Sequence, residues 1–323
     1  MIFLTGATGL VGSFVAKQLV GEGYTVKCLV RPAADKKLLE DIHNNIVFVE
    51  GDIMDISLLR AHLKGVDCII HCAAIISYCS NKQDLMFNTN VVGTANVVNA
   101  ALECSVRKMI HVSSVAALGR KEGVTRINEH AKWEESPNNT GYGRSKYFAE
   151  LEVWRGAEEG LQVSIVNPSI ILGAGDTAKS STKLFDYVYR ENLFYTDGNI
   201  NYVDVKDVAK AIATLVKEDH LNEQFILNGG TTSIKNFFEK IAHQVSKTPP
   251  HIKANRFILA LGWRLGAIYS FFTNKEPTLT KETSRISKFH YEYIPEKSID
   301  KLKLKYTPLE ESIRWTCQML WDK

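Results

Sequence analysis

Short apolar runs alternate with helical patterns along the first two thirds of the chain. The segments between the runs carry apolar residues at the three- and four-residue spacing of amphipathic helices. The fourth of these predicted helices is a long one, from about Asp84 to Glu103. This alternation predicts an α/β fold with a doubly wound parallel sheet. The predicted strands lie near residues 1–5, 25–30, 46–49, 67–72, 107–112 and 162–167.

The alternation stops after Pro168 and returns only briefly before the C-terminal third. We predict one sheet domain built from residues 1–168 and 201–228. The remaining residues, 169–200 and 229–323, are predicted to form a smaller, mostly helical lobe.

An apolar stretch covers residues 257–272, flanked by Arg256 and Lys275 and interrupted by Arg264. It is too short and too broken to span a membrane, which takes about 20 apolar residues. Packing inside the helical lobe is the simplest interpretation. A lid over a lipophilic substrate and a surface helix that contacts a bilayer or a dimer partner are the alternatives.

Composition narrows the class of protein. With 323 residues and 45% apolar content, the chain can bury one large core and a smaller lobe. Met1 already lies in the first predicted strand and no apolar run reaches the length of a membrane span, so we expect a cytoplasmic protein without a signal peptide. The six cysteines form no Cys-x-x-Cys pair, so we expect neither a disulfide nor a metal. No basic run carries interleaved aromatic residues, which argues against nucleic acid as a partner.

A glycine-rich turn follows the first predicted strand and precedes an amphipathic helix that extends to about Val20. Gly6 permits a tight turn, Gly9 lets the backbone approach a pyrophosphate, and Gly12 lets the helix pack close to the strand. The free N–H groups at the start of the helix favour an anion. We therefore predict a dinucleotide site that includes Gly6, Thr8, Gly9, Leu10, Val11 and Gly12.

Four Tyr-x-x-x-Lys runs occur in the chain, and Tyr142 to Lys146 is the one that opens a helical segment downstream of a strand ending in two serines. On a helix Lys146 lies one turn after Tyr142, where its ammonium favours the phenolate. A tyrosine with an ordinary pKa of about 10 needs such help to act as an acid or base near neutrality. The rival runs fall in a loop, on an alternating strand and across a proline, and begin at Tyr78, Tyr202 and Tyr293.

The order of these motifs resembles the extended short-chain dehydrogenases/reductases, the superfamily of nucleotide-sugar epimerases, dihydroflavonol reductases and 3β-hydroxysteroid dehydrogenases. The resemblance runs through nearly the whole chain. It implies a Rossmann-like sheet domain, a substrate-binding C-terminal lobe, an NAD(P) cofactor and a homodimer formed through the helix that carries Tyr142. Further matching segments are Gly51-Asp52-Ile53, Asp67 with residues 69–74, Asn90-Val91-Val92-Gly93-Thr94, Val112-Ser113-Ser114, Asn167-Pro168-Ser169 and residues 203–209.

The resemblance also implies a role for each site residue. Ser114 would bond the carbonyl oxygen of the substrate, Tyr142 would exchange the proton, and Lys146 would hold the nicotinamide ribose and stabilise the phenolate. His71 lies within an apolar strand, which favours a core histidine over a catalytic one. For Asn90, a helix-interior amide bonded to the backbone is nearly as good an interpretation as a cofactor contact. The cofactor-binding residues implied besides Tyr142 and Lys146 are Asp52, Ile53, Ala73, Ala74, Asn90 and Pro168.

The end of the second predicted strand bears on which dinucleotide binds. Arg31 stands where NAD-preferring relatives usually place an acidic residue for the ribose 2′-hydroxyl. An arginine cannot accept that hydrogen bond but can clamp a 2′-phosphate, so NADP is favoured. Asp35 could turn back toward the ribose, which keeps NAD as the alternative.

The reaction class is less constrained. Ser114 is followed by Val115-Ala116-Ala117, whereas a sugar dehydratase of this superfamily would carry an Asp-Glu pair there. Residues 276–280 and 305–312 are similar to the branch that contains the dihydroflavonol reductases and 3β-hydroxysteroid dehydrogenases, which favours reduction of a small, apolar ketone or aldehyde. A nucleotide-sugar epimerase with tightly bound NAD is the alternative. A catalytically silent dinucleotide-sensing regulator is the minor one, because such members usually lack the Tyr or the Lys.

Overall fold

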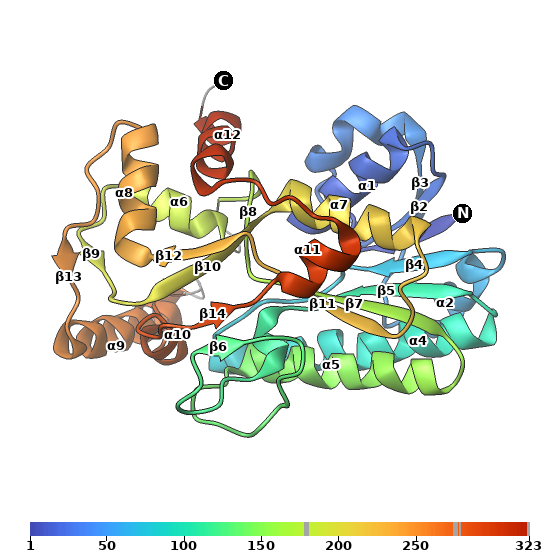
Figure 1. Cartoon of the computed structure of the whole chain (residues 1–323), viewed down its shortest axis with the longest axis horizontal. Coiled ribbons are helices and arrows are strands. Elements are labelled where there is room, and N and C mark those ends of the chain that lie inside the picture. Colours follow the sequence, from blue (N-terminus) through green and yellow to red (C-terminus); the bar gives the residue numbers. More distant parts are fainter. Residues whose placement is uncertain (178–180, 274–276, 278, 322–323) are drawn as a thin grey trace.

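In the computed structural model, a seven-stranded parallel sheet with the order β11-β7-β5-β4-β1-β2-β3 forms the centre of the larger part of the molecule (Figure 1). The structure describes residues 1–177, 181–273, 277 and 279–321. The predicted α/β fold is confirmed, and each of the six predicted strands agrees with an observed one to within one residue at either end. The strands are β1 Ile2–Thr5, β2 Val26–Val30, β3 Ile46–Glu50, β4 Cys68–His71, β5 Lys108–Val112, β7 Gln162–Pro168 and β11 Glu223–Leu227.

Helices cover both faces of this sheet (Figure 1). Successive strand residues point to opposite faces, so Ile2 and Leu4 pack in one apolar cluster while Phe3 packs in the other. The first cluster is completed by α1 Leu10–Gly21, α7 Val205–Lys217 and α11 Glu296–Leu302. The second is completed by α2 Ile56–Leu63, α4 Gly93–Glu103 and α5 Gly141–Glu158.

The long helix expected between residues 84 and 103 is continuous but not uniform. It consists of α3 Gln83–Phe87, a π-helical turn η3 Asn88–Val92, and then α4. A π turn inserts an extra residue into the helical repeat and is often found at functional sites. Asn90 lies in this turn.

The smaller lobe combines short strands with helices. A three-stranded sheet of order β12-β10-β8 joins it to the larger part, and the α6–α8–α12 helices cover that sheet with Phe185 and Phe237 in the core. β10 pairs within this small sheet, whereas α7 and β11 return the chain to the main sheet. The elements are β8 Ile170–Leu172, α6 Thr182–Tyr189, β9 Phe194–Tyr195, β10 Asn199–Asp204, β12 Gly230–Ser233, α8 Ile234–Gln244, β13 Ile252–Lys253, α9 Arg256–Thr273, α10 Lys281–Ile286, β14 Glu292–Tyr293 and α12 Leu309–Trp321.

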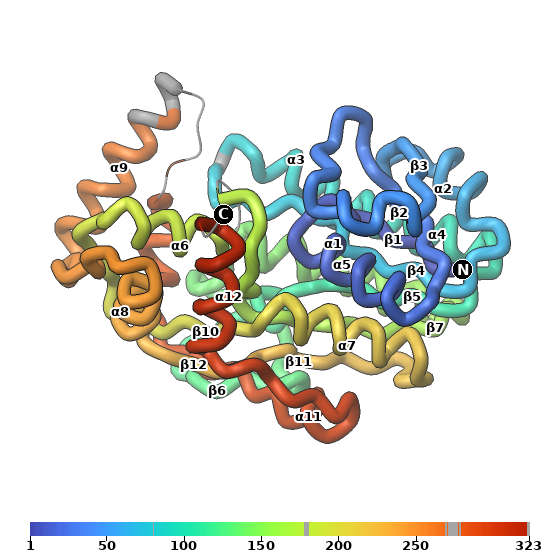
Figure 2. Tube along the Cα trace, turned by 90° about the horizontal axis from the view of Figure 1, so that it is seen from above, coloured from blue at the N-terminus to red at the C-terminus, as the bar shows by residue number. Residues whose placement is uncertain are grey.

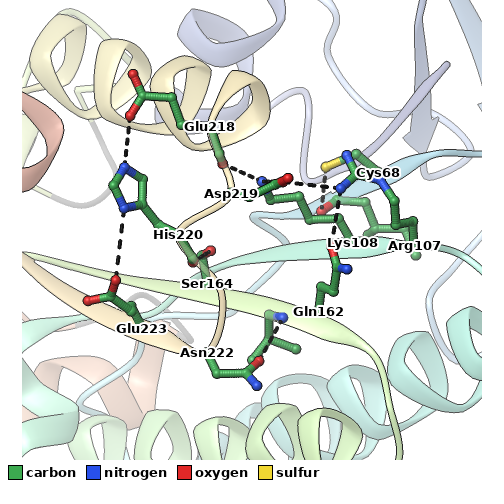
Figure 3. A network of polar contacts seen from close by, with 12 residues as sticks. Cys68, Arg107, Lys108, Gln162, Ser164, Glu218, Asp219, His220, Asn222 and Glu223 are labelled. Carbon is green, nitrogen blue, oxygen red and sulfur yellow. Dashed lines mark hydrogen bonds and ion pairs between the residues drawn. The ribbon is translucent and has the colours of Figure 1, made fainter.

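A polar network closes the amino-terminal edge of the main sheet (Figure 3). The buried Lys108 begins β5, and its Nζ donates to the backbone oxygen of Glu218 (2.6 Å) and to Asp219 Oδ1 (3.3 Å). Ser164 Oγ on β7 donates to the backbone oxygen of His220 (2.6 Å). These bonds fasten the loop between α7 and β11 to the strands, at the edge opposite to the glycine turn.

Within the described residues, no helix is long and apolar enough to cross a membrane. The same part of the chain contains no cluster of three or more side chains suited to hold a metal ion.

Candidate active site

The glycine turn between β1 and α1 has no room for side chains. Gly6 has φ +70°, and a Cβ there would lie 2.7 Å from the backbone nitrogen of Ala73. A Cβ on Gly12 would collide with the backbone oxygen of Gly6. Both positions therefore require glycine, and the turn forms a cradle of bare backbone next to the loop that follows β4.

The amino terminus of α1 opens onto this cradle. Gly9 is the N-cap, and no side chain in the described structure caps the helix. Leu10 and Val11 form the first turn, whose amide groups have no earlier helical carbonyl to bond. Free N–H groups and the positive end of the helix dipole suit a pyrophosphate, so the cradle fits a dinucleotide. Thr8 is half-buried in the same turn.

The loop after β4 packs against the glycine turn. The N–H of Ala73 donates to Thr5 Oγ1 (3.2 Å), which joins this loop to the end of β1. Ala74, the next residue, is exposed. Both alanines therefore border the predicted cofactor cradle.

The candidate adenosine-binding residues follow β2 and β3. Arg31 comes directly after β2 and is exposed, and the half-buried Asp52 follows β3, where its Oδ1 accepts the N–H of Met54 (3.0 Å). Ile53 is only 5% exposed and belongs to the core beneath α4. Asp35 accepts the N–H of Lys37 (2.9 Å), so its carboxylate is engaged at the start of a short 3₁₀ helix, η1 Lys37–Asn45. The cofactor roles of Arg31, Asp52 and Ile53 stay predictions.

Tyr142 and Ser114 are brought together by two helix starts. Ser114 follows β5 and caps the 3₁₀ turn η4 Val115–Leu118, and Thr140 caps α5 by accepting the N–H of Gly143 (2.9 Å). A Cβ on Gly143 would lie 2.7 Å from the backbone oxygen of Ala116. The glycine inside the Tyr-x-x-x-Lys run thus lets α5 approach the turn after β5, and the Ser114 side chain lies close enough to the Tyr142 phenol to act against the rise of its pKa.

The Tyr142 phenol is protonated at neutral pH. Burial raises the pKa of Tyr142 above its ordinary value of 10, Tyr78 raises it further, and the hydrogen bond with Ser114 acts in the opposite direction. The rings of Tyr78 and Tyr142 meet edge to face at 6.2 Å. The sequence led us to expect a phenolate favoured by Lys146, but loss of solvation dominates in the structure.

Lys146 lies on α5 and is 2% exposed. Its Nζ donates to the backbone oxygen of Val112 (2.9 Å) and lies 3.4 Å from His111 Nε2, so the ammonium sits at the carboxyl end of β5. Burial lowers the pKa of Lys146 to about 8, and Glu150 acts against this decrease. Ligands of open α/β sheets bind at this edge of the sheet.

Glu150 was missed by the sequence analysis. It lies one turn after Lys146 on α5, is 5% exposed, and accepts hydrogen bonds from Asn167 Nδ2 (2.6 Å) and Gln224 Nε2 (3.1 Å). Asn167 Nδ2 also donates to the backbone oxygen of Ser114 (2.9 Å). Burial raises the pKa of Glu150 to about 7. The four-residue spacing from Lys146 was the available signal, because it places both side chains on one helix face.

Asn90 is 1% exposed and bonds protein groups on both sides. Its Oδ1 accepts the N–H of Ile75 (2.7 Å), and its Nδ2 donates to the Ile75 oxygen (2.9 Å) and to Ser145 Oγ (3.0 Å). The side chain therefore ties the loop after β4 to α5 next to Lys146. These contacts fit the backbone-bonded interpretation, and a cofactor contact for Asn90 stays a prediction.

His71 and Pro168 are both buried in the sheet domain. His71 is fully buried between Thr5 Oγ1 (2.7 Å from Nδ1) and Thr94 Oγ1 (3.0 Å from Nε2), and burial lowers its pKa to about 3. It is a neutral core histidine, as expected. Pro168 is buried at the carboxyl end of β7, on the same sheet edge as Ser114.

The family model described as "NAD dependent epimerase/dehydratase family" matches residues 2–228. The chain belongs to this family. It is an NAD(P)-dependent enzyme of the extended short-chain dehydrogenase/reductase type, as the order of its motifs predicted.

Several similar proteins carry reductase names. A Synechocystis protein provisionally named dihydroflavonol 4-reductase is 32% identical over 209 residues, which cover 64% of this chain and 60% of that protein. Cinnamoyl-CoA reductase 1 from Petunia hybrida is 29% identical, with 70% of this chain and 72% of the relative covered. Sterol demethylase protein B from Methylococcus capsulatus is 28% identical over 77% of this chain and 76% of its own length.

Solved structures agree on the fold. The crystal structure of gox2253 is 31% identical and superposes with a TM-score of 0.83, covering 99% of this chain and 97% of its own. UDP-glucose 4-epimerase from Thermotoga maritima, solved with UDP-glucose, superposes with a TM-score of 0.80 at 19% identity, covering 98% of this chain and 97% of its own. At that identity the likeness concerns the fold alone.

Proposed function

We propose that the protein reduces the carbonyl group of a small, apolar ketone or aldehyde with NADPH, and that Tyr142 supplies the proton. The observation that carries this proposal is a phenol buried next to Ser114 at the carboxyl edge of the sheet, where burial raises the pKa of Tyr142. A phenol that stays protonated at neutral pH is in the form that donates a proton, which suits the reductive direction.

The side chains divide the reaction among them. When bound in the glycine cradle, the dinucleotide supplies the hydride that goes to the carbonyl carbon. Ser114 Oγ donates a hydrogen bond to the carbonyl oxygen, and Tyr142 gives its proton to the same oxygen as negative charge develops there. Lys146 is charged below its pKa of about 8; it holds the ribose hydroxyls and stabilises the phenolate that Tyr142 leaves behind.

The choice of NADP rests on Arg31. Its guanidinium is exposed at the end of β2, where a 2′-phosphate would accept two charge-assisted hydrogen bonds. Asp35, the residue that kept NAD open, already accepts the N–H of Lys37. These two positions favour NADP over NAD.

The substrate class rests on the relatives. The reductase names of the Synechocystis and Petunia proteins support a carbonyl reduction, and the sterol-related name of the Methylococcus protein supports an apolar substrate. A cytoplasmic location and a homodimer formed through α5 are further parts of this proposal.

A nucleotide-sugar epimerase with tightly bound NAD is the second candidate. It is favoured by the family description, which names epimerases, and by a Ser, Tyr and Lys set that serves both reactions. The two functions differ in cofactor turnover, because a reductase exchanges its dinucleotide in each cycle and an epimerase keeps it.

The test uses purified protein, NADPH and a panel of apolar ketones and aldehydes, with UDP-sugars measured in parallel. We expect protein that purifies largely without dinucleotide and oxidises one NADPH for each carbonyl consumed. Interconversion of a UDP-sugar at constant nicotinamide absorbance, with no oxidation of NADPH by any carbonyl, would replace the reductase proposal with the epimerase.

A further inference from the structure

Helix α9 presents an apolar face to solvent. Phe257, Leu261, Leu265 and Ile268 are 70%, 60%, 56% and 55% exposed. Their spacing of four, four and three residues places them along one side of the helix. The interpretation of residues 257–272 as buried core is therefore wrong for this face, although Leu259 is buried as expected.

The opposite side of α9 packs against the chain. A Cβ on Gly262 would lie 3.2 Å from Leu279 Cδ2, and one on Gly266 would lie 3.1 Å from the backbone oxygen of Leu279. Gly262 and Gly266 follow Leu259 on this side at helical spacing. The helix is thus fastened along the side away from its exposed apolar residues, and Figure 2 shows it reaching outward from the rest of the molecule.

The charges on α9 have one sign. The sequence of the helix contains Arg256 and Arg264 and no acidic residue. The guanidinium of Arg256 lies 5.3 Å from the Phe257 ring centre, and that of Arg264 lies 4.5 Å from the ring centre of Trp263. Among the described residues neither arginine forms an ion pair with a carboxylate. Both are exposed, and although Arg264 Nη1 donates to the backbone oxygen of Ala260 (2.8 Å), the other N–H groups of its guanidinium can bond an external anion.

The exposed apolar residues and the two arginines together indicate whether substrate, a second copy of the chain or a bilayer covers this face of α9. A lid over the substrate would direct its apolar side chains inward, whereas the four on α9 are exposed to solvent. A second copy of the chain would bring Arg256 and Arg264 toward their equivalents, with no acidic residue on either helix to neutralise them. A bilayer with anionic headgroups accepts both features, since apolar side chains insert below the phosphates and arginines bond them.

We propose that α9 binds the surface of an anionic lipid bilayer, with Phe257, Leu261, Leu265 and Ile268 inserted and Arg256 and Arg264 on headgroup phosphates. Exposed apolar residues next to the helix extend the same end of the lobe, since β13 leads into α9 and pairs with β9. These residues are Leu193, Phe194 and Ile252, which are 49%, 38% and 38% exposed.

The docking face is linked to the active site through α10. Glu282 Oε1 accepts the N–H of Gly141 (3.1 Å), the residue before Tyr142, and Arg285 Nη2 donates to the backbone oxygen of Asn139 (3.1 Å). Helix α10, which packs on α9, therefore connects the helix that the bilayer would hold to the segment that starts α5. Delivery of an apolar substrate from the membrane would follow, and this last consequence rests on the proposed carbonyl reduction.

Flotation with vesicles tests the binding, without dinucleotide or substrate. The protein is mixed with vesicles of phosphatidylcholine alone or of equal parts phosphatidylcholine and phosphatidylglycerol. We expect the wild type to bind the anionic vesicles. Vesicle binding should fall at least tenfold in Leu261→Gln/Leu265→Gln. It should fall less in Arg256→Gln/Arg264→Gln, by an amount similar to the effect of added salt on the wild type. The matched control is Ile299→Gln/Met319→Gln, which changes exposed apolar residues on α11 and α12 and should bind as the wild type does.

Two outcomes would overturn the proposal. One is equal vesicle binding by the wild type and the Leu261→Gln/Leu265→Gln variant, or no binding by either. The other is a wild-type dimer in the absence of lipid that this variant converts to a monomer, which would assign the face to a second copy. Dinucleotide affinity and thermal midpoint, measured for each variant, show that it is folded. Because the assay contains no substrate, its result is independent of whether carbonyl reduction is found.

Discussion

Two buried lysines lie at opposite ends of β5 and have different surroundings. Lys108 begins the strand at the amino edge, where Asp219 and the backbone oxygen of Glu218 accept its hydrogens (Figure 3). Lys146 reaches the carboxyl end from α5, where the Val112 backbone oxygen accepts its hydrogen. Their residue exposures are 0% and 2%, so burial alone does not separate them.

The two lysines differ in the carboxyl group that lies next to each of them. Asp219 is exposed and its pKa is lowered by hydrogen bonds from Arg107 and then Lys108, so it is ionised next to Lys108. The carboxyl group close to Lys146 belongs to Glu150, whose pKa burial raises to about 7 and whose oxygens bond Asn167 and Gln224. A buried lysine next to an ionised carboxylate stabilises the fold, whereas one without such a partner keeps its donors for a ligand.

The largest effect should come from Tyr142→Phe, because it removes the proton donor at the carboxyl edge. We expect kcat to fall by about 10²–10⁴-fold while dinucleotide affinity stays within about twofold of the wild type. Steady-state kinetics and a fluorescence titration of NADPH measure both. Tyr306→Phe is the matched control, since its hydroxyl bonds Ser298 (2.8 Å) away from the site and its loss should leave kcat unchanged. Robust turnover in Tyr142→Phe would refute the assigned role.

The second-largest effect is expected on dinucleotide affinity, from replacing an arginine at the carboxyl edge of the sheet. Arg31→Gln should weaken NADP(H) binding roughly ten- to a hundredfold and leave NAD(H) binding nearly unchanged, because one charge-assisted pair with the 2′-phosphate is lost. Arg107→Gln at the amino edge is the control and should change neither affinity. Calorimetric titrations with both dinucleotides make the comparison. Equal losses for NADP and NAD in Arg31→Gln would remove the argument for NADP.

The third effect is a difference in pH dependence between the two carboxyl groups. The pKa of Glu150 is raised from 4.5 to about 7, so its contribution to stability is present below pH 4.5 and is lost as pH rises toward 7. Glu150→Gln cannot titrate, so the wild type should lose about 1–3 kcal/mol relative to this variant across that window. Urea unfolding at a series of pH values measures the loss. A parallel pH dependence of the two proteins would contradict a buried, protonated Glu150.

Asp219→Asn gives the opposite sign and serves as the comparison. Because the pKa of Asp219 is lowered, its contribution is present above the ordinary value of 3.8 and is lost as pH falls below it. The wild type should therefore lose stability relative to Asp219→Asn only in acid. Any loss of this kind between pH 5 and 7 would mean that the two edges are not distinguished by their carboxyl groups.

The sequence was most informative where one local pattern decides the structure. Apolar runs located six of the seven strands of the main sheet to within one residue, because a buried parallel strand needs little besides apolar length; β11 was not located in this way. Gly6 and Gly12 could be assigned because their positions exclude a side chain. Tyr142 and Ser114 meet as expected, since the strand end and the helix start each carried a motif.

The remaining features depend on contacts between distant segments. Glu150 is in the core because Asn167 and Gln224, from β7 and β11, bond it, and no local pattern shows these partners. The pKa of Tyr142 is raised through burial against Tyr78, a residue that the sequence placed in a loop. The sequence left the exposure of α9 as one alternative beside burial, since an apolar stretch favours burial unless its neighbours are known.

The most direct test compares Lys146→Met with Lys108→Met, measuring kcat and the free energy of unfolding at neutral pH for both. Lys146→Met should lower kcat at least a hundredfold and weaken dinucleotide binding, with unfolding free energy within about 1 kcal/mol of the wild type. Lys108→Met should do the reverse, losing about 1–3 kcal/mol of stability because the backbone oxygen of Glu218 loses its donor and Asp219 keeps only Arg107, with kcat within about twofold. A loss of kcat in Lys108→Met equal to that in Lys146→Met, or normal turnover in Lys146→Met, would contradict the division of roles between the two ends of β5.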